Sequence, residues 1–112
     1  MPGASYNQGD IVLIPFPFTD LSNSKVRPAL IVSNATVNKT SDLICAQITS
    51  QVYKDTFTFE IKDADVTTSL KGYSEVRCHK LFTADKAIIQ KKISHLHASK
   101  QTTLLNKIKS LL

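Results

Sequence analysis

The two arginines of this chain stand out chemically, because lysine supplies nearly all of its other positive charge. Arg27 and Arg77 are accompanied by twelve lysines. Lysine serves general solubility equally well, whereas the planar guanidinium group stays protonated and binds two oxygens of one phosphate or carboxylate. The arginines are therefore the first candidates for an anion or phosphate site. Ion pairs at the surface or at a strand edge are the competing structural interpretation.

Residues that bind anions or move protons accompany the arginines along the sequence. These candidates are Asp20, Ser22, Ser24, Lys25, Thr49, Ser50 and His79. Arg27 begins one expected strand and Thr49 ends the next, so an antiparallel hairpin of the two strands would place them side by side. The segment before Arg27 could then fold over both residues and complete a pocket.

In such a pocket, Arg27 could stabilise the charge of a phosphate as a preorganised cationic clamp. Thr49 is too weak an acid to ionise at neutral pH, so its natural role is a hydrogen bond to a phosphate oxygen. The imidazole of His79 titrates near neutrality and could take or return a proton. Structural alternatives stay open: Arg27 pairs only with Asp20, or Thr49 only closes a turn. His79 would then be an ordinary strand residue with one face in solvent.

Metal-dependent and cofactor-dependent chemistry has little support in the sequence. We find no glycine-rich phosphate loop, no His-Glu-x-x-His, no paired Cys-x-x-Cys and no nucleophile elbow. Cys78-His79 with His95-x-His97 could be imagined as zinc ligands, but structural zinc sites have a tighter ligand spacing. We therefore expect neither a metal nor a cofactor.

The composition is that of an ordinary globular protein, with 42% hydrophobic and 21% charged residues. A length of 112 residues predicts one domain over residues 1–112. The net charge of +5 and a pI near 9.3 favour an anionic partner such as nucleic acid or an acidic peptide. Cys45 and Cys78 lie in apolar runs, where free cysteines behave as small hydrophobes in a reducing compartment. With no signal peptide and no membrane-length apolar run, we expect a cytoplasmic protein without membrane contact.

Short apolar runs predict a mostly β protein. The expected strands cover residues 11–14, 27–33, 42–49, 56–61, 74–82 and 86–93. Two prolines and a polar tip predict a loop over 15–25. Leucine and isoleucine at helical spacing near the C-terminus predict one amphipathic helix, with Ser99 as its N-cap. The pattern indicates a small antiparallel barrel or rolled sheet with a terminal helix.

Four segments, in this order over nearly the whole chain, resemble the MazF/PemK family of toxins from bacterial toxin–antitoxin pairs. They are Gly9-Asp10-Ile11-Val12, Arg27-Pro28-Ala29-Leu30-Ile31-Val32-Ser33, Ile48-Thr49-Ser50-Gln51, and Val76-Arg77-Cys78 with Thr83-Ala84-Asp85-Lys86. The arginine-proline strand start and the Ile-Thr-Ser-Gln strand end are together the specific part of this pattern.

The resemblance implies an SH3-like barrel of about five to seven antiparallel strands with a C-terminal helix. It further implies a homodimer and a metal-independent, sequence-selective endoribonuclease that acts on single-stranded RNA and is inhibited by a cognate antitoxin. By this similarity Arg27 and Thr49 are the catalytic pair, with Ser50 and Arg77 near the scissile phosphate. The family often has an acidic residue after Arg-Cys, where this chain has His79, and a proton-transfer role for His79 is a hypothesis. Further RNA contacts are expected from Asp20, Ser22, Ser24 and Lys25.

A non-catalytic nucleic-acid- or protein-binding module on the same barrel is the alternative function, because fold alone does not decide activity. The joint presence of Arg27 and Thr49 favours an enzyme. Aromatic residues that could stack on bases are compatible with either function. They are Phe16, Phe18, Tyr53 and Tyr73.

Overall fold

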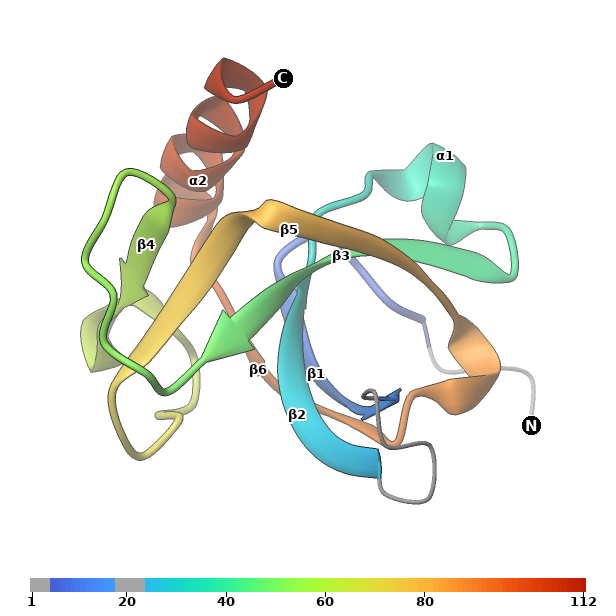
Figure 1. Ribbon diagram of the computed structural model, residues 1–112. Helices are drawn as coiled ribbons and strands as arrows, with labels where there is room; N and C mark the ends of the chain where they lie inside the picture. The colour runs from blue at the N-terminus through green and yellow to red at the C-terminus, as the bar shows by residue number, and fades with distance from the viewer. Residues whose placement is uncertain (1–4, 18–23) are drawn as a thin grey trace.

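A curled six-stranded antiparallel sheet with one C-terminal helix is seen in the computed structural model, which describes residues 5–17 and 24–112 (Figure 1). The elements are β1 Asp10–Pro17, β2 Ser24–Ile31, the single turn α1 Ala35–Asn38, β3 Asp42–Thr49, β4 Thr58–Ile61, β5 Ser74–Asp85, β6 Lys91–His95 and the helix α2 Ala98–Ser110. The strand order is β4-β5-β3-β2-β1-β6, and each neighbouring pair is antiparallel. This half-barrel confirms the expected rolled sheet with a terminal helix.

Both faces of the sheet carry an apolar core, because successive residues of a strand point to opposite faces. Ile11 and Leu30 belong to one cluster, which Leu104 of α2 joins. Val12 and Ile31, each one residue further along, belong to the other cluster. This explains the unbroken apolar runs of β1 and β2.

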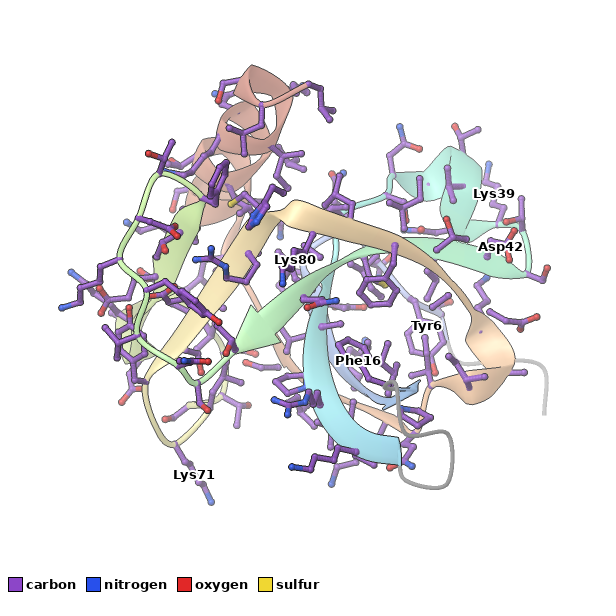
Figure 2. The ribbon with its side chains drawn as sticks, in the orientation of Figure 1. Tyr6, Phe16, Lys39, Asp42, Lys71 and Lys80 are labelled. Atoms are coloured by element: carbon purple, nitrogen blue, oxygen red, sulfur yellow. The ribbon has the colours of Figure 1, made fainter. Side chains whose placement is uncertain are left out.

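The second cluster lies within the curl of the sheet. Figure 2 shows Phe16 there, together with Tyr6 from the segment that precedes β1. Phe16 meets Phe82 of β5 edge to face, with ring centroids 5.1 Å apart. No helix within the described residues is long and apolar enough to cross a membrane.

Strand β5 bends where it passes from one neighbour to the other (Figure 1). Its register against β3 shifts between Ala46↔Leu81 and Ile48↔Val76, so residues 77–80 form a bulge on the β5 side. The first part of β5 pairs with β4 as well as with the end of β3. The end of β3 is thereby joined to the β4 side of the molecule.

The expected loop over 15–25 is shorter in the structure, because β1 continues to Pro17 and β2 begins at Ser24. Strand β6 pairs only with the segment 10–13 of β1. Among the described residues, no strand is paired with this side of β1 beyond Leu13, and a proline without an N–H is tolerated at such a position. Pro15 and Pro17, which had indicated a loop, are therefore compatible with the end of β1.

The expected strand over 86–93 was placed too early. The carboxylate of Asp85 accepts a hydrogen bond from the Ala87 N–H at 2.8 Å, which caps a 3₁₀ turn over Lys86–Ile88. The strand that follows begins only at Lys91. A local side-chain bond thus competes successfully with strand pairing in this segment.

Ser99 is not the N-cap of the helix, which begins at Ala98 with His97 as its cap residue. The His97 N–H donates to the Asp65 carbonyl at 2.8 Å, so the chain is fixed two residues before Ser99. No side chain caps this end. A long-range backbone contact therefore sets the helix start.

The expected strand over 56–61 begins at Thr58, since Asp55 closes a turn before it. The Asp55 carbonyl accepts from the Thr58 N–H at 3.2 Å, and its carboxylate accepts from the Phe57 N–H at 3.0 Å. In this segment Ile61 is buried, whereas Phe57 and Phe59 are half-buried.

Candidate functional site

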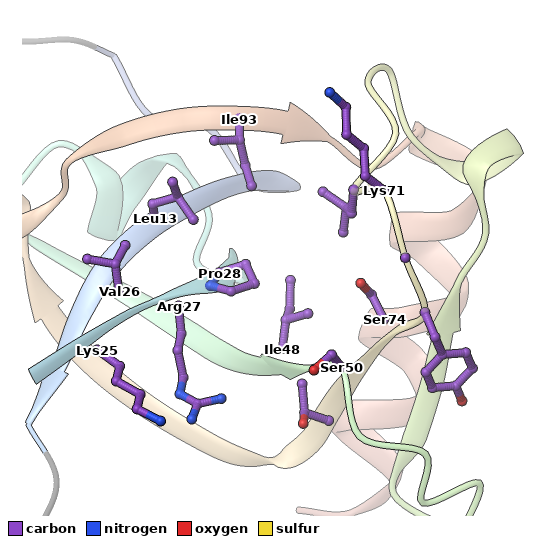
Figure 3. A pocket seen from close by; sticks show the side chains of 14 residues that line it. Leu13, Lys25, Val26, Arg27, Pro28, Ile48, Ser50, Lys71, Ser74 and Ile93 are labelled. Carbon is purple, nitrogen blue, oxygen red and sulfur yellow. The ribbon is translucent and has the colours of Figure 1, made fainter.

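A cavity of about 520 Å³ opens where β2 begins and β3 ends. Its apolar wall includes Leu13, Pro28, Ile48 and Ile93, and its polar lining includes Arg27, Thr49 and Ser50. Figure 3 shows Lys25 and Arg27 extending from one side of β2, while Val26 and Pro28 lie on the other side. The alternation of the strand therefore divides what β2 contributes to the cavity lining into a cationic side and an apolar side.

Arg27 and Thr49 are brought together by the pairing of β2 with β3. The register pairs Ala29 with Gln47. Continuing this antiparallel register by two residues on each strand places Arg27 opposite Thr49, and both line the cavity. The antiparallel pairing of these two strands, which the sequence predicted, is observed.

The Thr49 hydroxyl also closes a turn, as the structural alternative required. It accepts a hydrogen bond from the Gln51 N–H at 3.1 Å. A hydroxyl keeps its own proton and a second lone pair for another partner. Closing the turn is thus compatible with a hydrogen bond from Thr49 to a phosphate, and the turn fixes where Ser50 lies.

The charge of the cavity is positive. Its lining includes Lys25, Arg27 and Lys71, and the described lining residues include no Asp or Glu. Cations in a partly enclosed site attract an anion more strongly than the same cations on an open surface. The arrangement can hold a phosphodiester between a guanidinium group and two hydroxyls.

Arg77 lies outside this cavity lining and is only 6% exposed. Its guanidinium group donates to both Asp55 carboxylate oxygens, at 3.0 and 2.9 Å. It also donates to Glu75 Oε1 at 3.3 Å and to Thr58 Oγ1 at 2.9 Å. The bond to Asp55, partly offset by burial, raises the pKa of Arg77. To bind RNA directly, Arg77 would have to leave two carboxylates.

Glu75 was not among the candidates from the sequence, yet it is the centre of this network and is fully buried. Its donors are the backbone N–H groups of Tyr53 and Lys54 and the side chains of Thr58, Tyr73 and Arg77. Burial acts to raise the pKa of Glu75, but these hydrogen bonds outweigh it and lower the pKa to about 2. The signal in the sequence that could have identified Glu75 is its position two residues before Arg77, because residues i and i+2 of a strand share one face.

His79 is not brought to the cavity. Its ring is exposed and stacks on Phe57, with centroids 4.0 Å apart and an angle of 29° between the planes. It lies four residues beyond Glu75, within the bulge that interrupts the pairing of β5 with β3. His79 is therefore not among the residues that line the cavity with Arg27 and Thr49.

The remaining candidates come from the segment that leads into β2, from the start of β2 and from the residue after β3. Asp20 and Ser22 lie outside the described residues, and so does the side chain of Ser24. Lys25 and Ser50 are exposed and line the cavity. Within residues 5–17 and 24–112, no three His, Cys, Asp or Glu side chains gather so that they could hold a metal ion.

Comparisons with known proteins give the same picture of the fold. Residues 7–112 match the family model of the PemK-like, MazF-like toxins of type II toxin–antitoxin systems. No curated protein sequence matches the chain.

Solved structures with a similar fold include a MazE–MazF complex from Deinococcus radiodurans, with 19% identity, a TM-score of 0.78, and 96% of each chain covered. An endoribonuclease in complex with its cognate antitoxin, from a mycobacterial species, shares 17% identity with a TM-score of 0.76, covering 94% of this chain and 92% of that one. The Mycobacterium tuberculosis toxin MazF-mt6 shares 24% identity with a TM-score of 0.73, covering 90% and 93%. At these identities the similarity establishes a common fold.

Proposed function

Since the chain belongs to the family of PemK-like, MazF-like toxins of type II toxin–antitoxin systems, we propose that it is a metal-independent endoribonuclease that cleaves single-stranded RNA at selected sequences. The observation that carries the proposal is that Arg27 and Thr49, on adjacent antiparallel strands, both line a cation-rich cavity. A site that only bound RNA would have no need of this pair.

The reaction that fits these groups uses the nucleophile that RNA itself carries. The 2′-hydroxyl attacks the adjacent phosphorus, and the bond from phosphorus to the 5′-oxygen of the next nucleotide breaks. The products are a 2′,3′-cyclic phosphate and a 5′-hydroxyl. Negative charge grows on the phosphate oxygens in the transition state, where the Arg27 guanidinium stabilises it and the Thr49 hydroxyl donates a hydrogen bond. Ser50 lies beside Thr49 to hold the same phosphate.

Two protons must move in this reaction, one from the 2′-hydroxyl and one to the leaving 5′-oxygen. The open cavity lets water act at both positions. His79 is kept as a hypothetical proton carrier, although its ring stacks on Phe57 away from the described cavity lining. The pH–rate profile of His79→Ala decides this, since loss of one limb of the profile is expected only if His79 transfers a proton.

A homodimer is part of the proposal. A second cavity of about 420 Å³, lined by Ile14, Phe16 and Phe82, leaves apolar surface open beside Ile88, which is 43% exposed. A second copy of the chain would cover this surface. Light scattering at micromolar concentration should give about twice the monomer mass of 12.4 kDa, and a monomer mass would contradict the dimer.

The inhibitor that we propose is a cognate antitoxin with an acidic segment laid across the cavity. Carboxylates pair with guanidinium groups in the same geometry as phosphates do. Lys25, Arg27 and Lys71 supply the complementary charge. An RNA analogue and the antitoxin should therefore compete, and simultaneous binding of both would contradict occlusion of the site.

The experiment that tests the activity uses mixed-sequence RNA in excess EDTA. Cleavage should persist, and the products should carry 2′,3′-cyclic phosphate and 5′-hydroxyl ends. Oligonucleotides with a single 2′-deoxy nucleotide at the cleavage position should resist cutting. Equal cleavage of the 2′-deoxy substrate would refute 2′-hydroxyl attack, and binding without cleavage would favour the alternative of a non-catalytic module.

A further inference from the structure

Tyr53, in the loop between β3 and β4, presents an aromatic ring at the surface next to the candidate site. Its side chain is 47% exposed. One face of the ring lies against the Arg77 guanidinium group, whose central carbon is 4.2 Å from the ring centroid. This distance is that of a cation–π contact. The ring therefore has a charged group on one face, and much of its side chain is open to solvent.

The ring is held in place by the buried network below it. Glu75 Oε2 accepts a hydrogen bond from the Tyr53 N–H at 3.0 Å, and the Tyr53 hydroxyl donates to Gln51 Oε1 at 3.1 Å. Arg77 behind the ring is itself fixed by Asp55 at 2.9 Å. A side chain that is ordered before its ligand arrives loses less entropy on binding.

The backbone at this position is also set by the network. Lys54, the next residue, has φ of +47°, a left-handed conformation that non-glycine residues seldom adopt. Glu75 Oε2 accepts the Lys54 N–H at 3.0 Å as well, which offsets the strain. Strained positions that are fixed in this way concentrate at functional sites.

The Tyr53 ring lies at the rim of the cavity. Tyr73, which lines the cavity, donates its hydroxyl to the same Glu75 oxygen that accepts the Tyr53 N–H. Ser50, another lining residue, precedes Tyr53 by only three positions. A strand of RNA whose phosphate lies between Arg27 and Thr49 would carry a neighbouring base past this rim.

We propose that the outer face of Tyr53 is a stacking subsite for one nucleobase that flanks the cleaved phosphate. The assignment rests on the proposed function and names a residue that positions the substrate. Each base offers a flat π-face, and an aromatic side chain stacks on it without regard to most hydrogen-bonding groups. Tyr53 thus contributes affinity and register, while selectivity between bases comes from other contacts.

The test is a pairwise comparison of protein variants and substrates. Once a cleaved oligonucleotide is known, abasic nucleotides replace its bases one position at a time. Tyr53→Ala removes the ring, and Tyr53→Phe keeps the ring without its hydroxyl. Val52→Ala is the matched control, because Val52 is the adjacent residue and is 58% exposed. Circular dichroism verifies that each variant is folded.

Tyr53→Ala should lower kcat/KM for the intact substrate by about 5- to 150-fold, the range for one stacked base. Tyr53→Phe and Val52→Ala should stay within about 3-fold of the parent chain. For a substrate that is abasic at one particular flanking position, the effect of Tyr53→Ala should disappear. An equal loss on every abasic substrate would overturn the proposal, because it would mean that Tyr53 only covers the ion pair.

A second readout separates this proposal from the activity itself. The chain contains no tryptophan, so the fluorescence of 2-aminopurine in an uncleavable 2′-deoxy oligonucleotide can be followed with little protein background. Quenching that depends on Tyr53 supports the stacking subsite even if no RNA is cleaved. Absence of Tyr53-dependent quenching at every position, or a Tyr53→Ala effect on binding of an acidic peptide alone, overturns it.

Discussion

Thr49 lies directly opposite Glu75 in the pairing of β3 with β5, so a cavity-lining hydroxyl borders a fully buried carboxylate. Glu75 bonds the backbone two and three positions beyond Gln51, whose N–H the Thr49 hydroxyl accepts. The buried network and the turn after β3 are therefore connected through hydrogen bonds to the backbone of residues 51–54. This relationship leads to the first prediction.

Glu75→Gln should destabilise the fold. The neutral amide no longer offsets the charge of the buried Arg77. Its NH2 group is a donor and cannot accept the hydrogen bonds that the replaced carboxylate oxygen accepted. Removing one partner of a buried ion pair lowers the free energy of unfolding by about 3 kcal/mol or more. Urea unfolding at neutral pH measures this. Glu60→Gln is the matched control, because Glu60 lies opposite Glu75 on β4 but is exposed; a similar loss in both variants would contradict the role of burial.

The stability of the fold should fall in acid because of the same network. Hydrogen bonds lower the pKa of Glu75 to about 2 against the opposing effect of burial, and Arg77 lowers the pKa of Asp55. Both folded-state values lie below the unfolded ones of about 4, so the unfolded chain binds more protons in this range. The stabilisation is complete above about pH 5 and is lost as the pH falls towards about 2.

Unfolding free energies measured between neutral pH and acid check this dependence. Glu75→Gln should show a shallower fall than the parent chain, since one of the two carboxylates no longer titrates. If the unfolding free energies of Glu75→Gln and the parent chain fall equally with pH, groups other than Glu75 cause the acid sensitivity.

The two cysteine thiols should be unreactive in the folded protein. Cys45 and Cys78 are free and buried, and burial raises the pKa of Cys45 to about 12 and that of Cys78 to about 11. Only the thiolate reacts with alkylating reagents. Iodoacetamide at mildly alkaline pH should label neither cysteine until denaturant is added, and rapid labelling of the native protein would contradict this burial.

Gly9→Ala should destabilise the junction between β1 and α2. Gly9 has φ of +95°, and a Cβ there would collide with the Gln101 side chain, which donates to the Leu96 carbonyl at 2.7 Å. We expect a loss of about 1–3 kcal/mol in the free energy of unfolding. In a Gln101→Ala background the collision is relieved and the loss should be smaller. An unchanged unfolding midpoint in Gly9→Ala would contradict the account.

The sheet and the antiparallel pairing of the strands that carry Arg27 and Thr49 could be predicted because they depend on local patterns. Apolar runs locate strands, and two consecutive strands joined by a short segment pair antiparallel. The register then follows within a residue or two. The start of α2 could not be predicted, since the contact of His97 with Asp65 joins segments far apart in the sequence.

The environments of Arg77 and His79 depend on a β-bulge and on a long-range contact, neither of which the alternation of residues along a strand predicts. The bulge at residues 77–80 of β5 carries His79 away from the end of β3. The partners of Arg77 include Asp55, 22 positions away along the chain. The sequence pattern predicts the strand in which each residue lies. Which charged groups surround a guanidinium group depends on the three-dimensional fold.

Arg27→Lys is the measurement that tests the central claim most directly, with Arg77→Lys as the same exchange at the buried ion pair. The lysine keeps the charge of Arg27 but loses the planar group that binds two oxygens. Single-turnover cleavage of RNA at saturating protein should slow by about 10²-fold, while the affinity for a 2′-deoxy analogue changes much less. Arg77→Lys should instead lower the free energy of unfolding, and it should slow cleavage less than Arg27→Lys does. Normal cleavage by Arg27→Lys would contradict the assignment of Arg27 as the group that stabilises the transition state.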